Sequence, residues 1–422
     1  MTNISVFSSL LSPQLKVIES ANANRILPLQ SHVHIYLIGT STIGPSFEPT
    51  VVSSVVDFTN QFGFPGNNID AQTTLDCVRI IYANDSTANL YFIRVGNDSS
   101  DHNNYITGIN SLEVEDEYPG GFLIAPSAFR HITDEAERVA VGNALIAKAE
   151  EQDFMAIIDP RFGISYPGAP ASVPIADANK YTGVTRGHAA YYYPYLRESI
   201  SGKSRAIPPS CVAASVATAR FKVEGFKPGA GLKYPVKGVS GPTMKVTRAL
   251  QDELDPAGIN AIRKIRNQGT VIWGMRTRTN AVLYRYFHYR VIANVVNRTF
   301  RKSIDLKRQL FDVIDGQGQL FAYLEEAANS VGRQLYQSGL LFGATEVDAF
   351  AAKCDFENNT PEMIQQGFVL VEFTYSISPA VDKMVVNSRL TGVGTVNLAN
   401  ETGVALDGTE GEGEGQADAD TP

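Results

Sequence analysis

Residues 254–361 carry the feature that most constrains the fold, a close succession of helix-capping, glycine and β-branched positions. Asp255 is a good N-cap, and Pro256 is a good first helical residue. Three apolar residues follow at the spacing of one helical face: Ile259, Ile262 and Ile265. Gly269 then ends the predicted helix. The β-branched and aromatic run up to Trp273, the only tryptophan of the chain, predicts a buried strand.

The chain before residue 250 alternates predicted strands with predicted helices. Apolar runs predict strands over residues 33–38, 90–95, 122–124 and 154–158. Helical periodicity and capping residues predict helices over residues 54–62, 72–82, 134–152 and 210–219. Polar residues, glycine and proline predict that three further stretches are mostly loop: residues 96–118, 160–188 and 223–245. Strand, helix and strand in this order are typical of an α/β layer.

The chain after Trp273 predicts a second region of mixed structure. An extended segment is expected over residues 282–286. Amphipathic helices are expected over residues 291–300 and 320–335, and strands over residues 369–375 and 384–386. Thr360 is expected to cap a short helix that Pro361 opens.

Length and composition indicate a multidomain protein that is made in the cytoplasm. The chain has 422 residues, 44% of them hydrophobic, which exceeds the size at which a single core usually stops growing. It has no run of eighteen apolar residues and no basic, apolar leader at its start. Cys77, Cys211 and Cys354 lie far apart in apolar settings, so they are interpreted as buried thiols rather than disulfides or metal ligands.

Charge is distributed unevenly along the chain. Residues 401–422 contain seven acids and no base, and without them the net charge of −8 would be −1. Residues 261–310, in contrast, contain twelve Lys or Arg and a single acid, Asp305. From about Asp407 the acidic, glycine-rich sequence has nothing to bury and is expected to be disordered.

The motifs of common catalytic and cofactor sites are incomplete or missing. Gly39 and Gly44 have the spacing of a phosphate-binding loop, but Pro45 stands where the lysine is needed, so a plain turn is favoured. His32 and His34 share one face of a strand without an acidic or cysteine partner, which favours ordinary strand histidines over metal ligands. Neither a Gly-x-Ser-x-Gly nor a His-Glu-x-x-His motif occurs. The sequence therefore predicts no catalytic, cofactor or metal site.

The order and spacing of several motifs resemble one family, the contractile tail sheath proteins of phage tails and related bacterial injection systems. The C-terminal motifs are Gly-Ile-Asn-x-Ile-Arg, x-x-Trp-Gly-x-Arg-Thr, an arginine-rich segment, Lys-Cys-Asp and Asn-Thr-Pro-Glu, at residues 258–263, 271–277, 284–290, 353–355 and 359–362. Upstream similarity covers residues 39–45, 57–63, 91–95 and 189–196. The chain departs from the family in the sequence at residues 12–17 and in its acidic segment.

The resemblance implies a structural subunit without an active site. Such subunits form stacked rings of six around an inner tube, with baseplate and terminal cap proteins as further partners, in a phage virion tail or a bacterial contractile injection particle. The N- and C-terminal arms each add a strand to a neighbour's sheet, and this kind of link survives large rotations of the domains that it joins. Contraction is then a switch between two packings of the same subunits, and it drives the tube through a target envelope.

The resemblance and the composition together predict a fold of α/β and α+β multidomain class. An N-terminal arm is expected over residues 1–30, and an α/β sheath N-terminal and middle region over residues 31–250. The conserved C-terminal sheath domain, of α+β type, is expected over residues 251–390. Residues 391–422 are expected to form the C-terminal arm and the acidic, disordered tail.

The basic block 261–310 has more than one interpretation. We expect a protein interface, with Arg298, Arg301 and Lys302 on the polar side of the predicted helix facing the inner tube or a neighbouring subunit. Arg276 and Arg278 are weaker interface candidates that could instead form buried pairs beside Trp273. A nucleic-acid-binding protein is an alternative, because aromatic residues interleave with the arginines. An α/β enzyme is the other alternative, because the first half alternates strands and helices.

Overall fold

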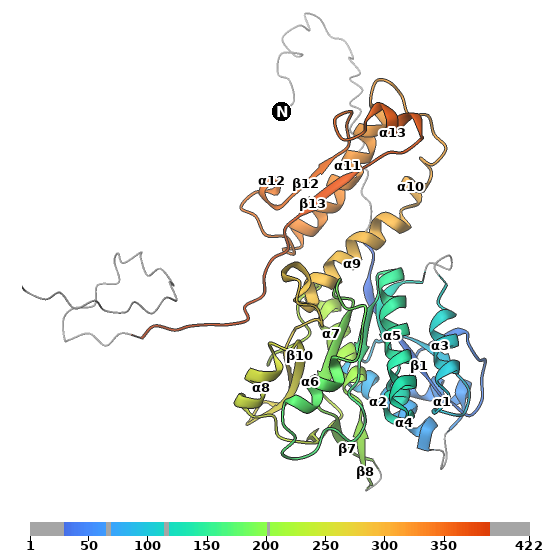
Figure 1. Ribbon diagram of the computed structural model, residues 1–422, viewed down its shortest axis with the longest axis vertical. Coiled ribbons are helices and arrows are strands. Elements are labelled where there is room, and N and C mark those ends of the chain that lie inside the picture. Colours follow the sequence, from blue (N-terminus) through green and yellow to red (C-terminus); the bar gives the residue numbers. More distant parts are fainter. Residues whose placement is uncertain (1–28, 65–68, 114–117, 201–202, 389–422) are drawn as a thin grey trace, which may run out of the picture. The chain divides into compact units, whose positions relative to one another are not determined.

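The structure is a computed structural model of the chain, and it describes residues 29–64, 69–113, 118–200 and 203–388 (Figure 1). The chain divides into two compact units, residues 1–380 and 381–422. Nearly all of the predicted N-terminal arm lies outside the described residues. The predicted C-terminal arm and the expected disorder from Asp407 lie entirely outside them.

An eight-stranded sheet forms the centre of the first unit, with the strand order β11-β10-β6-β5-β4-β1-β3-β2. The strands are β1 (His32–Gly39), β2 (Pro49–Val52), β3 (Asn89–Arg94), β4 (Gly120–Ile124), β5 (Met155–Ile158), β6 (Ala189–Tyr193), β10 (Ile259–Ile265) and β11 (Gly269–Trp273). All neighbours pair in parallel except at the two ends of the sheet, where β2–β3 and β10–β11 are antiparallel. The central strands are buried almost without interruption, as in parallel sheets that are covered on both faces.

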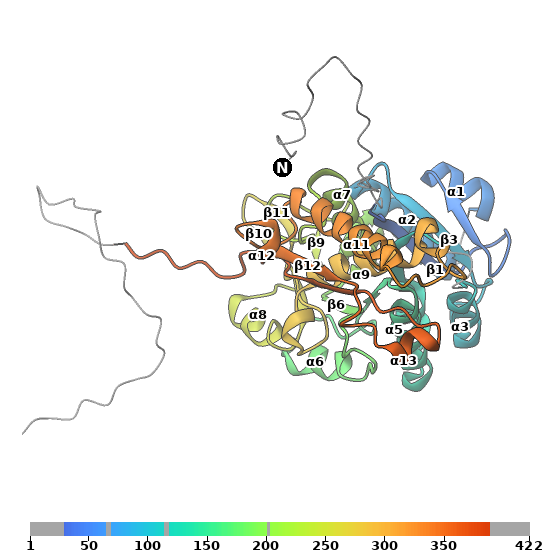
Figure 2. The same cartoon turned by 90° about the horizontal axis from the view of Figure 1, so that it is seen from above.

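Helices cover both faces of this sheet (Figure 2). On one face lie α1 (Val55–Phe62), α2 (Ile69–Asn84) and α7 (Pro209–Glu224). On the other lie α3 (His102–Asn110), α4 (Pro126–His131), α5 (Glu135–Gln152) and α6 (Ser172–Ala178). Strand β1 shows why the core is double, because Ile35 and Leu37 pack into one apolar cluster while Tyr36 and Ile38 pack into the other.

The remaining elements of the first unit complete it. A three-stranded sheet contains β7 (Leu196–Ile200), β8 (Lys203–Ile207) and β9 (Gly241–Pro242), and α8 (Arg248–Leu254) precedes β10. Then follow η2 (Val282–Tyr284), α9 (Phe287–Lys302), α10 (Ile304–Lys307), α11 (Gln319–Gln337), α12 (Glu346–Ala349), β12 (Phe350–Lys353), α13 (Pro361–Gln365) and β13 (Glu372–Tyr375). As predicted, Thr360 caps the helix that Pro361 opens, accepting a hydrogen bond from the backbone N–H of Met363. No helix in the described parts of the chain is both long and apolar enough to cross a membrane.

The helix predicted from Pro256 to Gly269 is wrong, because Ile259–Ile265 form strand β10 in a hairpin with β11. Asp255 caps the C-terminus of α8 instead of starting a helix. Ile259 and Ile262 pack into the two different clusters, so their three-residue spacing reflects a strand that is buried on both faces. The strand that ends at Trp273 is present, but Trp273 itself is 36% exposed.

Other local predictions also need correction. Two stretches that were predicted to be mostly loop contain helices, α3 within residues 96–118 and α6 within residues 160–188. The segment expected to be extended at residues 282–286 begins with the 3₁₀ turn η2. The predicted strand at residues 384–386 is absent. The mixed α/β architecture is confirmed, whereas the predicted domain boundaries at residues 30, 250 and 390 stay predictions.

The buried carboxyl group of Asp159 should make the stability of the fold depend on pH. Asp159 follows β5, is fully buried, and accepts hydrogen bonds from the backbone N–H and the hydroxyl of Ser210, at 2.7 and 2.5 Å. Burial raises the pKa of Asp159 to about 7, and the bonds from Ser210 offset this only in part. Because the folded-state pKa of Asp159 lies above the unfolded value of 3.8, the contribution of this carboxyl to stability is greatest below pH 4 and is lost as the pH rises to about 7.

We therefore expect Asp159→Asn to raise the free energy of unfolding at pH 8 by about 4 kcal/mol more than at pH 4. Urea unfolding at the two pH values measures the difference. Asp252→Asn, at an exposed position, is the matched control and should show no such difference. If both variants change equally at both pH values, the Asp159 carboxyl is not protonated in the folded protein at neutral pH.

Candidate interface surfaces

One side of α9 docks against the point where α5 ends and β5 begins. Four residues at helical spacing form this docking stripe: Asn294, Asn297, Arg298 and Arg301. Their acceptors follow in reverse sequence order along residues 154 to 151 of the same chain. They are Phe154 O (3.0 Å), Asp153 Oδ1 (2.9 Å), Gln152 O and Glu151 O (3.1 Å). Two of these acceptors, the carbonyls of Glu151 and Gln152, belong to the last turn of α5, where the helix itself supplies no donor.

Arg298 lies at the centre of the docking stripe and is 3% exposed. Its guanidinium donates to the carbonyl oxygens of Gln152 and Tyr118 and lies 4.8 Å from the centroid of the Phe154 ring. A Cβ atom on Gly120 would approach the Arg298 Nε to 3.0 Å, so the side chain passes tightly over the start of β4. Arg298 therefore joins α9 to two separate parts of the α/β core, the junction of α5 with β5 and the start of β4.

The prediction that Arg298 lies on an exposed polar side of its helix is wrong. Of the three helix bases, Arg301 keeps a 43% exposed side chain while it pairs with Asp153 at 2.7 Å. Lys302 is half-buried and donates to the Tyr118 carbonyl at 3.0 Å. Helical periodicity identified the polar face correctly, but it does not distinguish solvent from main-chain carbonyls as the partner. Asn294 and Asn297 on the same face were the missed signal, because short amides there indicate specific partners.

Arg276 and Arg278 form structural contacts within the subunit, which was one of the two roles that the sequence allowed for them. Arg276 is 8% exposed and binds both carboxylate oxygens of Asp255, at 2.8 to 3.2 Å. Arg278 is half-buried and bonds to the Ala257 carbonyl and, at 2.9 Å, to the side chain of Asn179. Sequence reasoning missed Asn260, whose buried amide bonds both the N–H and the C=O of Arg276, at 2.6 and 2.8 Å.

A two-stranded sheet beyond α9 has open edges. β12 and β13 pair only with each other among the strands of the described residues, with Phe350 opposite Tyr375 and Lys353 opposite Glu372. A groove of about 980 Å³ runs beside β13, between α9, α11 and the segments 306–314 and 367–375. Its lining is mostly apolar and includes Phe300, Leu310, Leu320, Leu324, Phe368 and Val371. An open strand edge beside an apolar groove is a surface suited to strand addition.

A small apolar cluster packs the β12–β13 sheet against α9 and α11. Ile292 and Val296 of α9 pack with Val331 and Leu335 of α11 and with Phe350 of β12. Leu29, at the start of the described chain, packs against this cluster, and the Gln30 N–H bonds the Thr299 hydroxyl at 3.0 Å. α9 therefore contributes to two cores, one on each side of the helix.

Two of the histidines, His32 and His34, lie in apolar or backbone-bonded settings. The His32 ring lies edge-on to Phe122 at 5.2 Å, and the His34 Nδ1 lies 3.2 Å from the Gly120 carbonyl. All three cysteines are buried. In the parts of the chain that the structure describes, no three or more His, Cys, Asp or Glu side chains gather closely enough to hold a metal ion.

Comparison with known proteins agrees with this architecture. No family model matches the sequence. The tail sheath protein of Burkholderia phage BcepMu is 24% identical over 298 residues, which is 68% of this chain. The aligned part spans only 59% of the length of that relative.

Solved structures of contractile systems share the fold over most of the chain. The helical sheath of the anti-feeding prophage in its contracted state gives a TM-score of 0.68 at 21% identity, covering 89% of this chain and 98% of that one. The contracted sheath complex of the extracellular contractile injection system PVC gives 0.65 at 21%, covering 90% and 97%. A chain of the anti-feeding prophage baseplate gives 0.67 at 20%, covering 90% and 99%. The resemblance to contractile sheath proteins that the motifs indicated is therefore confirmed.

Proposed function

We propose that this protein is a subunit of a contractile sheath, which polymerises helically around an inner tube and contracts to drive that tube through a target envelope. The observation that carries the proposal is the fold that 89 to 90% of this chain shares with chains of assembled, contracted sheaths. Stacked rings of six fit the symmetry given for the anti-feeding prophage baseplate. The role is structural rather than catalytic, and its partners are other copies of the chain, the inner tube, and baseplate and cap proteins.

The open edges of β12 and β13 are the acceptor sites that we propose for the arms of neighbouring subunits. A two-stranded sheet is marginal by itself, so added strands stabilise it by supplying main-chain hydrogen bonds to the open edges. The apolar groove beside β13 would take the side chains that alternate toward it from such an added strand. These links hold copies together while the domains rotate during contraction.

Residues 381–388, in the second unit, have the composition of such an arm. Val381, Met384, Val385 and Val386 are exposed, Val385 to 89%. The strand predicted at residues 384–386 is missing because a strand needs a hydrogen-bonded neighbour, and the described chain gives it none. Pairing with the sheet of another copy would bury these side chains and supply the missing bonds.

Electron microscopy of the purified full chain tests the sheath assignment. We expect tubes or ring stacks of uniform width, because rings that stack around a fixed axis set the diameter. The nucleic-acid alternative predicts association only after DNA or RNA is added, and the enzyme alternative predicts discrete particles. Discrete particles over a wide range of salt and protein concentration would contradict the sheath proposal.

A role for Arg301 and Lys302 in holding the inner tube or the next subunit stays a prediction. We expect Arg301→Gln with Lys302→Gln to weaken tube attachment or ring stacking, and the wild-type contact to weaken with salt. Co-sedimentation with the tube protein at several salt concentrations measures this. Arg161→Gln with Arg285→Gln, both exposed positions, is the matched control. If the Arg301→Gln, Lys302→Gln variant attaches to the tube as the wild type does, these two residues do not belong to the interface.

The end of the acidic segment is expected to be dispensable for assembly. It is rich in glycine and lacks aromatic residues, so it has little to contribute to a packed wall. A chain that lacks residues 407–422 should form tubes of wild-type width and length in electron micrographs. If this truncation abolishes tubes, the arm that pairs with neighbours extends past residue 406.

A further inference from the structure

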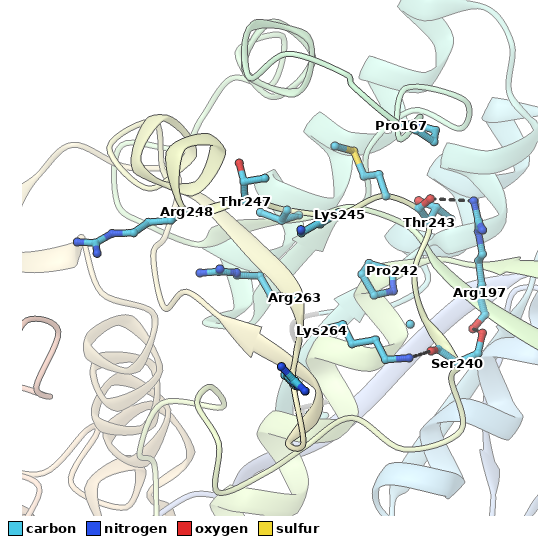
Figure 3. A pocket seen from close by; sticks show the side chains of 14 residues that line it. Pro167, Arg197, Ser240, Pro242, Thr243, Lys245, Thr247, Arg248, Arg263 and Lys264 are labelled. Atoms are coloured by element: carbon cyan, nitrogen blue, oxygen red, sulfur yellow. Dashed lines mark hydrogen bonds between the residues drawn. The ribbon is translucent and has the colours of Figure 1, made fainter.

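A cationic groove lies at the opposite end of the sheet order from β2, beside β10. It has a volume of about 900 Å³ and is lined in part by residues 240–248, which connect β9 to α8 (Figure 3). Six bases line it: Arg197, Lys245, Arg248, Arg263, Lys264 and Arg266. No acidic residue is among its lining residues. The groove therefore concentrates positive charge on a chain whose net charge is −8.

The geometry keeps these bases available to a ligand. Within the described residues, the side chains of Arg197 and Lys264 bond only to backbone carbonyls, those of Thr243 at 2.8 Å and Ser240 at 3.1 Å, as the dashed lines in Figure 3 show. Such bonds fix the positions of the cations without neutralising them. Lys245 and Arg266 are exposed and have no ion pair among the described residues.

The two remaining bases are also poorly neutralised. Arg248 lies 3.9 Å from Asp252, with both side chains largely exposed, which makes a weak, screened pair. Arg263 bonds the neutral Gln251 side chain at 2.7 Å, while its buried Nε has no partner in the described part of the chain. An anionic ligand would thus meet fixed positive charges and at least one unsatisfied donor.

The chain itself contains a polyanion that matches this groove. Residues 401–422 carry seven acids and no base, spaced by glycine and other small residues. Extended chain of this kind reaches about 3.3 Å per residue, so consecutive acids could meet consecutive bases along the groove. Another acid-rich stretch, residues 113–117, carries four acids over five residues, so residues 401–422 form the longer polyanion.

We propose that the cationic groove binds the acidic segment 401–422 of this chain. The contact is electrostatic and adaptable rather than a packed interface, because the segment has few apolar residues to bury. It adds a salt-sensitive link, distinct from strand exchange, that assembly does not require. The proposal is independent of the sheath assignment, since it rests only on the charges of one chain.

The test uses the full chain with its seven acids at positions 401–422 changed to the corresponding amides, which leaves the groove free of its own ligand. A fluorescent peptide of residues 401–422 is titrated against this protein, and anisotropy reports binding. We expect saturable binding that weakens at least about tenfold between low and high salt. Binding to the wild-type chain should be weaker, because its own segment competes.

Two charge-reversal pairs locate the site. Lys245→Glu with Arg266→Glu should weaken peptide binding about tenfold or more, because two attractive contacts become repulsive. Arg161→Glu with Arg285→Glu changes the net charge equally at exposed positions outside the groove and should leave binding unchanged. Thermal unfolding of each variant confirms that the fold is intact. Equal weakening by both pairs would show attraction to the whole protein and overturn the proposal.

A single-stranded oligonucleotide of similar charge serves as the competing probe. If the oligonucleotide binds and Lys245→Glu with Arg266→Glu abolishes its binding, while the acidic peptide does not bind, the groove is a nucleic-acid site and the proposal is wrong. In the wild-type chain, carbodiimide should link Lys245 or Lys264 to acids of residues 401–422. Mixing isotope-labelled and unlabelled chains shows whether the linked pair comes from one copy or two. Absence of any such link at low salt would also contradict the proposal.

Discussion

A chain that lacks residues 1–25 is expected to stay monomeric under conditions in which the full chain forms tubes. Without this arm, the open edges of β12 and β13 lose one of the strands that we propose they accept from a neighbour. Strand exchange supplies several main-chain hydrogen bonds per link, so its loss should abolish tubes rather than shorten them. Analytical ultracentrifugation and electron microscopy together measure the outcome.

The control for this deletion is the chain that lacks residues 407–422, which loses acidic sequence but should still assemble. Thermal unfolding of both truncated chains separates lost assembly from lost folding. Residues Leu29 and Gln30, which contact the fold itself, are kept in the deletion. Full-length tubes from the chain without residues 1–25 would show that this arm is not exchanged.

Arg298→Met is expected to destabilise the monomer by about 3 kcal/mol. The substitution keeps an unbranched apolar side chain but removes the donor to the Gln152 carbonyl, and it leaves the Tyr118 carbonyl with the bond from Lys302 alone. It also removes the stacking of the guanidinium on Phe154. Urea unfolding at protein concentrations below those of assembly gives the free-energy difference.

Arg301→Met is the matched control on the same helix, and it should cost about 1 kcal/mol or less because this side chain is partly exposed. Equal losses for the two variants would mean that burial of Arg298 does not determine its contribution. The comparison also has a practical consequence. Charge reversal at Arg298 would unfold the subunit, so interface tests on α9 have to be restricted to Arg301 and Lys302.

The α/β half of the fold was predictable where local signals agree with the tertiary structure. Ser54 caps the start of α1 and Gly63 caps its end, as their residue types suggest, and Asp134 caps the start of α5. Strand β1 was readable from its uninterrupted apolar run. In each of these elements a short window of sequence contains both the start signal and the buried face.

The failures occur where the deciding partner is distant in sequence. β10 is a strand because β6, about 68 residues earlier, offers it a parallel edge, with Ile259 opposite Tyr191. Arg298 is buried because α5, about 146 residues earlier, ends with unpaired carbonyls at the right place. A single window around either residue shows a helical period or a polar face, and it contains nothing that identifies the partner.

The docking of α9 also decides how the subunit carries mechanical load. Because one rigid helix belongs to both cores, a force applied at the β12–β13 sheet reaches the large sheet without passing through a flexible hinge. A pull along the helix axis loads the contacts of the docking stripe in shear, so they have to break together rather than one after another. In the sheath that we propose, the subunit would thus transmit a stroke as a stiff link and lose little of its work to internal stretching.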